Sequence, residues 1–209
     1  NPDVFRAMKP FLDLAEKVGS LHTQLADQRI NKVEVEFQGD LDAHVKLLTV
    51  AILRGLLKPV LSSSINYINA PHLAKQRGIA VAQITGLEKP NYPNLITCVA
   101  YWNGGHRLIS ATLFHTDEPR IVQVDDYRLD LKPEGRIMAV NSVDVPGVIG
   151  KMGTALGEAG INIASMRLGR AERGGSVMTF LKIDESLTNE VIEKLEQSEP
   201  IERVREVVL

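Results

Sequence analysis

Hydrophobic and polar residues alternate with two different periods along the first 130 residues. Apolar side chains recur at helical spacing from Phe5 to Leu25 and again between Asp42 and Leu57. Residues 32–38 instead alternate strictly between polar and apolar side chains, which is typical of a half-buried strand. From residue 79 to 131 the period of two dominates, with Asn103-Gly104-Gly105 as a hairpin turn. The pattern predicts an α+β domain with a mainly antiparallel sheet.

In the last 74 residues, strand-like and helix-like patterns follow one another in a different order. A short run of turn residues, Lys132-Pro133-Glu134-Gly135, marks a boundary. The order after it is strand, helix, strand, strand, helix, strand, which is the ferredoxin-like βαββαβ arrangement. Strands are expected near 136–143, 162–169, 175–184 and 201–208, and helices near 147–159 and 188–198. We therefore predict two domains, residues 1–132 and residues 136–209.

The first strand–helix turn of this second region carries the most suggestive polar chemistry. Asp144 ends the expected strand, and the chain turns through Pro146 and Gly147 into a helix whose first N–H groups can hold an anion. Asn162, at the start of the next strand, can both donate and accept hydrogen bonds. These groups suit a small zwitterion, with Asp144 accepting its ammonium group. From the residues alone, a helix-capping Asp and an Asn at the entry of a strand are the simpler explanation of the pattern.

Composition excludes several classes of function. The 24 Lys and Arg residues against 26 Asp and Glu residues give a net charge of −2 with mixed signs, which argues against electrostatic binding of nucleic acid. A single cysteine excludes an intrachain disulfide and fits a reducing cytoplasm. No apolar run is long enough to span a membrane. The histidines lack metal-ligand spacing and no Gly-x-Gly-x-x-Gly follows a strand, so we predict no metal, no NAD site and no catalytic residue here.

Two stretches of this chain resemble known families. Residues 144–149 (DVPGVI) followed by residues 157–163 (GEAGINI) are similar to the signature of an ACT domain, the amino-acid-sensing module of metabolic enzymes. Residues 56–61 (LLKPVL) and 65–71 (INYINAP) resemble the intervening, or allosteric-substrate-binding, domain of long-form D-3-phosphoglycerate dehydrogenases. The two modules occur in the order found in the C-terminal regulatory region of that family.

The resemblance implies a serine sensor. It implies that L-serine binds for feedback inhibition, at an interface between two ACT domains of a homo-oligomer. The contacts would come from Asp144, Asn162, Val143, Val145, Pro146 and Gly147. It also suggests a phosphate site for a phosphorylated ligand, for which solvated surface charge is the simpler explanation. The candidate residues are Arg120, Arg128, Lys132 and Lys182.

The resemblance also implies that this chain lacks the catalytic part of the parent enzyme. The catalytic and NAD-binding domains of the parent enzyme would precede Asn1, so this chain is expected to be inactive alone. Two alternatives remain open: a free-standing amino-acid sensor or scaffold, and the small subunit of an iron–sulfur L-serine dehydratase. The Ser-Ser-His-Thr-type stretch of the latter family is absent from this sequence.

Overall fold

The chain forms two compact units, Asn1–Asp125 and Asp126–Leu209. The computed structural model describes residues 2–39, 44–61, 64–85, 92–115, 117–170 and 172–209. Both units combine helices with a mainly antiparallel sheet, so the predicted α+β, two-domain fold is confirmed. The predicted boundary at residues 132–136 lies slightly further along the chain than the division between the two units.

The first unit alternates helices and strands before finishing in consecutive strands. Its helices are α1 (Pro2–Leu25), α2 (Val45–Leu57), the 3₁₀ turn η2 (Lys58–Val60) and α3 (Ala70–Gln76). Its strands are β1 (Lys32–Gly39), β2 (Ala80–Thr85), β3 (Asn94–Trp102), β4 (Gly105–Phe114) and β5 (Glu118–Val124). The first two positions expected for the second helix, 42 and 43, lie outside the described residues.

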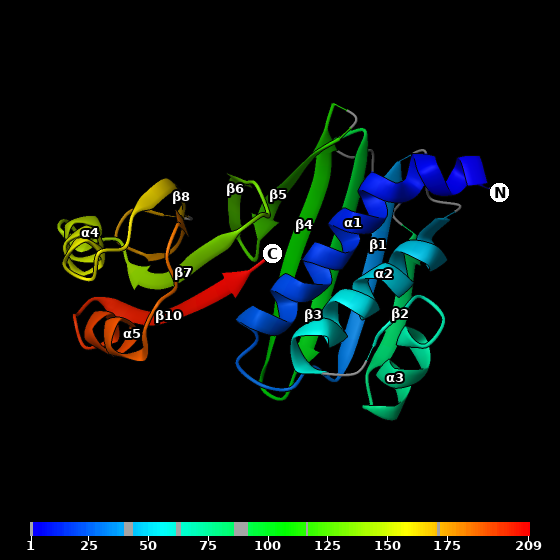
Figure 1. Ribbon diagram of the computed structural model, residues 1–209, viewed down its shortest axis with the longest axis horizontal. Coiled ribbons are helices and arrows are strands. Elements are labelled where there is room, and N and C mark those ends of the chain that lie inside the picture. Colours follow the sequence, from blue (N-terminus) through cyan, green and yellow to red (C-terminus); the bar gives the residue numbers. More distant parts are fainter. Residues whose placement is uncertain (1, 40–43, 62–63, 86–91, 116, 171) are drawn as a thin grey trace. The chain divides into compact units, whose positions relative to one another are not determined.

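The sheet of the first unit has the strand order β2-β1-β3-β4-β5. β1 pairs in parallel with β2, and the β1–β3, β3–β4 and β4–β5 pairs are antiparallel. The apolar residues of β1, Val33, Val35 and Phe37, are buried as their alternation predicts. Helices α1 and α2 lie side by side over one face of the sheet (Figure 1).

Two glycines let α1 and α2 approach until their backbones touch. A Cβ atom added at Gly55 would lie 1.9 Å from the carbonyl oxygen of Glu16, and one at Gly19 would lie 2.1 Å from that of Ile52. Beside this contact, Arg54 Nη1 pairs with Glu16 Oε2 at 2.5 Å. The Thr23 hydroxyl donates to the Leu56 carbonyl at 2.7 Å. The two helices therefore pack as one layer with no room for side chains at the crossing.

The second unit has the predicted βαββαβ order after one leading strand. Its elements are β6 (Tyr127–Leu131), β7 (Arg136–Val143), α4 (Val148–Glu158), β8 (Ile163–Arg170), β9 (Ser176–Ile183), α5 (Asn189–Glu196) and β10 (Ile201–Val208). The four-stranded sheet has the order β10-β7-β9-β8, with antiparallel neighbours throughout. β7 and β8 are therefore parallel to each other, and α4 makes the crossover between them.

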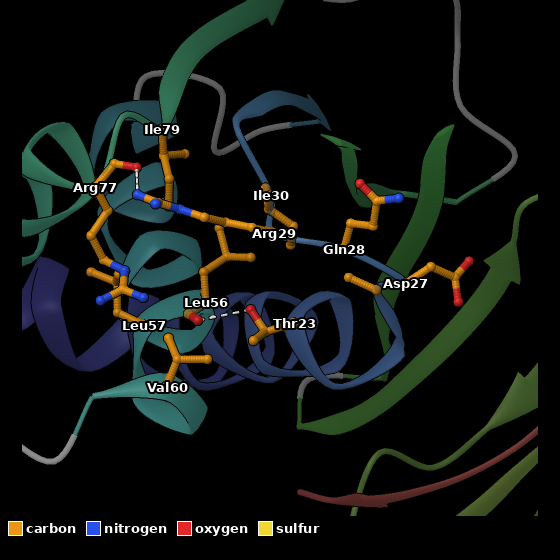
Figure 2. Close-up of a pocket in the computed structure, with 11 residues that line it drawn as sticks. Thr23, Asp27, Gln28, Arg29, Ile30, Leu56, Leu57, Val60, Arg77 and Ile79 are labelled. Carbon is orange, nitrogen blue, oxygen red and sulfur yellow. Dashed lines mark hydrogen bonds between the residues drawn. The ribbon is translucent and has the colours of Figure 1, made fainter. Parts of the chain in front are cut away.

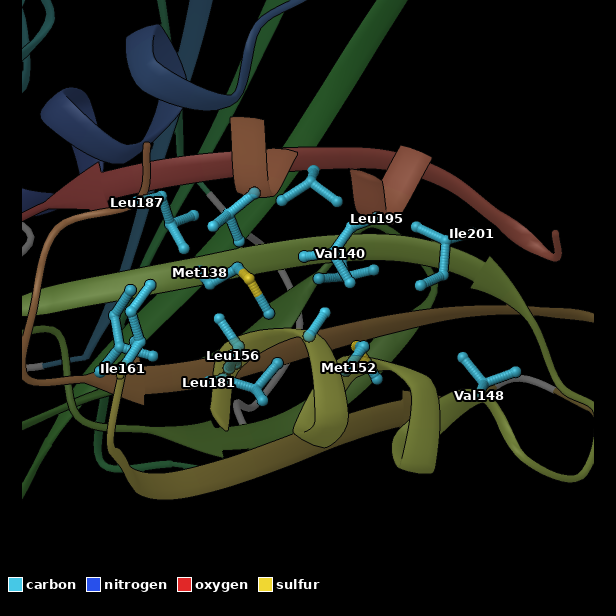
Figure 3. Close-up of a cluster of buried hydrophobic side chains, with 14 residues drawn as sticks. Met138, Val140, Val148, Met152, Leu156, Ile161, Leu181, Leu187, Leu195 and Ile201 are labelled. Atoms are coloured by element: carbon cyan, nitrogen blue, oxygen red, sulfur yellow. The ribbon is translucent and has the colours of Figure 1, made fainter. Parts of the chain in front are cut away.

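The core of the second unit lies between this sheet and its two helices. Met138 and Val140 of β7 pack with Met152 and Leu156 of α4 and with Leu195 of α5 in one buried cluster (Figure 3). Both helices therefore cover the same face of the sheet. This burial explains why α4 forms although three of its eleven residues are glycine, because isolated short helices are unstable and tertiary packing supplies most of their stability.

β6 lies against β8 within the same unit. The backbone carbonyl of Asp130 accepts a hydrogen bond from Arg167 Nε at 2.8 Å. A Cβ atom at Gly169 would lie only 2.6 Å from Cβ of Tyr127, so glycine is needed there for the approach of β6. Arg167 pairs with the buried Phe180 of β9. Its neighbour Met166 packs toward the helices, and successive residues of a strand point to opposite faces, so Arg167 lies on the other face of the sheet. β6 therefore contacts the side of β8 that faces away from α4.

Candidate functional site

Asp144 presents a fixed carboxylate directly after β7. Its Oδ2 accepts hydrogen bonds from Arg170 Nη1 at 3.0 Å and from the backbone N–H of Gly174 at 3.2 Å. Both donors come from the end of β8 and the turn into β9, which the pairing of Val143 with Ser176 brings beside the end of β7. The Asp144 side chain keeps 24% of its surface exposed. The carboxylate is therefore oriented by the fold and still accessible to a cationic group from solvent.

The turn after Asp144 brings the start of α4 to the same place. The N–H of Val145 donates to the Val143 carbonyl at 3.0 Å, and Pro146 has no N–H to offer. Gly147 caps the helix with φ of 95°, a conformation that favours glycine. The first-turn N–H groups of a helix have no intrahelical acceptor, and they carry the positive end of the helix dipole. Anion binding at this turn would therefore use the start of α4 rather than the Val145 N–H.

Asn162 occupies a different environment, between α4 and β8. Its Nδ2 donates to Asp184 Oδ2 at 2.7 Å, and its backbone N–H donates to Glu185 Oε2 at 2.8 Å. Its carbonyl accepts from the backbone N–H of Asp184 at 3.2 Å. Asn162 is exposed, so its position is fixed while its side chain remains reachable from solvent.

The two predicted ligand contacts lie at opposite ends of the same domain. Asp144 precedes the 11-residue helix α4 and Asn162 follows it, so about 16 Å of helix separates them. The sheet gives the same result, because Asp144 lies beside the start of β9 and Asn162 beside its end. A single ACT-type domain does not bring these side chains together around one small molecule.

Two of the four phosphate candidates meet in the second unit. Lys182 Nζ lies 2.8 Å from Glu134 Oε1, and Lys132 Nζ lies 3.0 Å from Glu134 Oε2. The hydrogen bonds from Lys182 and Lys132 lower the pKa of Glu134 to about 2. In this arrangement the two ammonium groups share one carboxylate, so an incoming phosphate would compete with Glu134.

The two arginine candidates have other surroundings. Arg120 belongs to the first unit, where its Nη2 lies 3.1 Å from Glu118 Oε2 and its guanidinium stacks over the Phe114 ring. Arg128 is an exposed residue of β6. The phosphate site therefore stays a prediction, and within the second unit its best-defined part is the lysine pair around Glu134.

Sequence reasoning missed the partners that hold the candidate site. Arg170 and Gly174 orient Asp144, and Asp184 and Glu185 orient Asn162. The short gap between the strands expected near 162–169 and 175–184 was the available signal, because a tight β8–β9 hairpin places its flanking residues beside the end of β7. Among the residues that the structure describes, no cluster of three or more His, Cys, Asp or Glu side chains is arranged to hold a metal. In the same described ranges, no helix is both long and apolar enough to cross a membrane.

Comparison with protein families assigns both parts of the chain. Residues 7–125 match the D-3-phosphoglycerate dehydrogenase intervening domain, and residues 137–200 match the ACT domain. The D-3-phosphoglycerate dehydrogenase of Methanocaldococcus jannaschii is 37% identical over 191 residues, which cover 91% of this chain and 36% of that protein. That of Bacillus subtilis is 31% identical over 194 residues, covering 92% of this chain and 37% of that protein. That of Archaeoglobus fulgidus is 35% identical over 197 residues, covering 93% and 37%.

The chain thus joins an α+β domain to an ACT domain of ferredoxin-like topology. Because the intervening-domain match covers more than half of its length, the chain belongs to the D-3-phosphoglycerate dehydrogenase intervening-domain family. It spans a little over a third of the length of the relatives that it matches.

Proposed function

We propose that this chain is the regulatory part of a cytoplasmic, NAD-dependent D-3-phosphoglycerate dehydrogenase, and that it binds L-serine between two ACT domains to inhibit a catalytic half outside this sequence. The observation that carries the proposal is the ACT-domain match together with the accessible, oriented Asp144 carboxylate at its strand–helix turn. Such inhibition would make sense in serine biosynthesis, because L-serine, the end product, would limit its own formation by inhibiting the dehydrogenase.

The chemistry at Asp144 suits an α-amino acid. The ammonium group of serine would pair with the Asp144 carboxylate, taking over the position that the Arg170 guanidinium holds. The serine carboxylate would face the first-turn N–H groups of α4, where an anion is stabilised by the helix dipole. Arg170, half-exposed beside Asp144, offers a second positive group to the same carboxylate. One end of the domain therefore complements both charges of a zwitterion.

The distance between Asp144 and Asn162 argues for two protomers per site. A two-fold pairing along the edge strand β8 would be antiparallel and would set the Asp144 end of one domain against the Asn162 end of its partner. Each serine would then contact Asp144 from one protomer and Asn162 from the other. Two equivalent sites would form in each dimer.

Loss of one of these side chains is expected to weaken serine binding strongly. Hydrogen bonds to charged groups contribute about 1.5–3 kcal/mol, so Asp144→Asn should weaken L-serine binding by roughly 10- to 150-fold. Asn162→Ala should have an effect of similar size. Calorimetric titration of the chain with L-serine measures both, and circular dichroism checks that the variants fold. Absence of binding to the dimeric wild-type chain would refute the serine assignment.

Mixing the two variants tests whether each site spans two protomers. An Asp144→Asn chain paired with an Asn162→Ala chain has one site with both substitutions and one intact site. Random exchange should therefore restore tight binding at about a quarter of all sites. If both contacts came from one protomer, mixing would restore none. Separately tagged chains, refolded together and purified through both tags, would enrich the mixed dimer and sharpen the result.

A serine site that spans two protomers also requires that two chains associate through α4 and β8. Val145, Ile149 and Leu168 are large apolar residues of this region with 40–51% of their surface exposed. Ile149→Asp should abolish dimers at about 50 μM in sedimentation experiments without unfolding the domain, because an acidic residue is favourable in the first turn of a helix. Val208→Asp is the matched control, since Val208 is equally exposed but lies on the opposite edge strand, β10. Dissociation by Val208→Asp alone would place the contact on that edge instead.

The phosphate site is a subsidiary proposal. Lys132 and Lys182 would bind a phosphorylated ligand in place of Glu134, whose carboxylate they hold in its absence. Arg120 and Arg128 would contribute only if the ligand also reached them.

A further inference from the structure

A pocket in the first unit lies at the ends of three helices. It has a volume of about 320 Å³ and is bordered by the last turns of α1 and α2, the segment after α3, and residues 26–30 leading into β1 (Figure 2). Every residue that forms it belongs to the first unit, and none is a candidate contact of the serine or phosphate sites. Its volume is at the lower end of the range for small-molecule sites.

The floor and one wall of this pocket are apolar. Ile30, Leu56 and Leu57 are buried beneath it, with at most 6% of their surface exposed. Val60, on η2, is 49% exposed at the rim, and Ile79 covers the opposite side. An apolar body entering the pocket would remove this surface from water, which is favourable in proportion to the area buried.

Two guanidinium groups face the same space. Arg29 extends toward Arg77 and donates from Nη2 to the Arg77 backbone carbonyl, while the Arg77 guanidinium lies beside Leu57 (Figure 2). Among the described residues, no carboxylate lies within 4 Å of either guanidinium. Asp27 lies on the side of the pocket away from Arg77. An arginine has five N–H donors, so both side chains retain donors for a ligand.

The helix ends use only one of these donors, the Arg29 Nη2 that binds the Arg77 carbonyl at the end of α3. The Leu56 carbonyl accepts from the Thr23 hydroxyl, and the Arg77 carbonyl is satisfied by a single Arg29 nitrogen. Charge-assisted hydrogen bonds from arginine to a carboxylate are stronger than those to a neutral carbonyl, and they are often bidentate. A carboxylate at this position would therefore be preferred over a neutral acceptor.

We propose that this pocket binds a small monocarboxylate with a compact aliphatic body, with the carboxylate between Arg29 and Arg77 and the body on Leu56, Leu57 and Val60. The site would be a second ligand site of the chain, independent of the amino-acid site at Asp144. It requires both an anionic head and an apolar body. Neither an inorganic anion nor a neutral isostere satisfies both requirements.

The probe is 4-methylpentanoate, with 4-methylpentanamide and sulfate as comparisons. We expect saturable binding of 4-methylpentanoate to the full chain by calorimetry or ligand-observed NMR. Arg77→Gln and Arg29→Gln should each weaken it about tenfold, as loss of a hydrogen bond to a charged group predicts. The amide should bind at least tenfold more weakly than the acid for the same reason. Sulfate should not compete.

Two control variants separate binding in this pocket from nonspecific attraction to surface charge and from binding at the serine site. Lys75→Gln removes an exposed positive charge of α3 that does not border the pocket, and it should leave binding unchanged. Asp144→Asn should also have no effect, so failure here is distinguishable from failure of the serine site. Absence of saturable binding would overturn the proposal. So would equal binding of acid and amide, or unchanged affinity in both Arg29→Gln and Arg77→Gln.

Discussion

Replacing Gly55 with alanine is expected to lower the free energy of unfolding of the first unit by about 3 kcal/mol, the upper part of the range for overpacking a well-packed core. The added methyl group would lie 1.9 Å from the carbonyl oxygen of Glu16, and the contact atom is backbone that cannot rotate away. α1 and α2 would have to separate, which would loosen the apolar contacts of both helices with the sheet. Urea unfolding followed by far-ultraviolet circular dichroism measures the change.

The sign of the effect makes this test decisive. Helix propensity alone predicts that Gly→Ala in a helix stabilises by about 1 kcal/mol. Gly55→Ala should destabilise instead, and Gly19→Ala should behave in the same way because of its contact with Ile52. Lys46→Ala, an exposed position of the same helix, should change stability by less than about 0.5 kcal/mol. A stabilised Gly55→Ala chain would show that the two helices do not touch at this crossing.

Periodicity was sufficient to predict the fold because most helices, strands and turns of this chain are specified by residues close together in the sequence. The alternation of β1 predicted which of its residues are buried, and the turn at residues 103–105 predicted the β3–β4 hairpin. The approach of α1 to α2 could not be read in this way. Gly19 and Gly55 lie 36 positions apart in the printed sequence, and nothing near either residue indicates that the two face each other across a helix crossing. Contacts between distant segments are fixed by packing rather than by local pattern.

The candidate site also combines features that local sequence predicts with features that depend on packing between distant segments. The turn at Asp144 and the start of α4 could be predicted from Pro146 and Gly147, whose backbone preferences are local. The hydrogen bond from Arg170 to Asp144 depends on the register of two strand pairs, and the sequence does not fix that register residue by residue. The pocket between Arg29 and Arg77 depends on three helix ends meeting, so it had no signal in the sequence.

His22 is a polar residue of α1 that lies in the core. It follows Val18 by four positions and precedes Leu25 by three, so it shares their buried helix face. Its Nε2 lies 3.1 Å from the Cys98 carbonyl oxygen, which fixes Nε2 as the donor of a neutral ring. Its Nδ1 is buried and has no hydrogen-bond partner among the described residues. The ring is therefore held in its uncharged form.

Mild acid is expected to destabilise the first unit through His22. The pKa of His22 is lowered to about 3, chiefly by burial and to a smaller extent by the Arg107 charge, against the opposing effect of the hydrogen bond to Cys98. The unfolded chain takes up a proton below about pH 6.5 that the folded chain excludes, so stability should fall by about 1.4 kcal/mol per pH unit until the pKa of the folded state is reached. Between pH 6.5 and 5.0 the loss should be about 2 kcal/mol.

The His22→Gln variant isolates this contribution. Glutamine keeps an N–H donor for the Cys98 carbonyl but does not titrate, so the variant should lose about 2 kcal/mol less than the wild type between pH 6.5 and 5.0, whatever its stability at pH 7. The lowered pKa of Glu134 acts at more acidic pH, because its unfolded value is 4.5 and its folded value about 2. Urea unfolding at several pH values gives the slope for both chains. Equal slopes would show that His22 is protonated, or reaches water, in the folded protein.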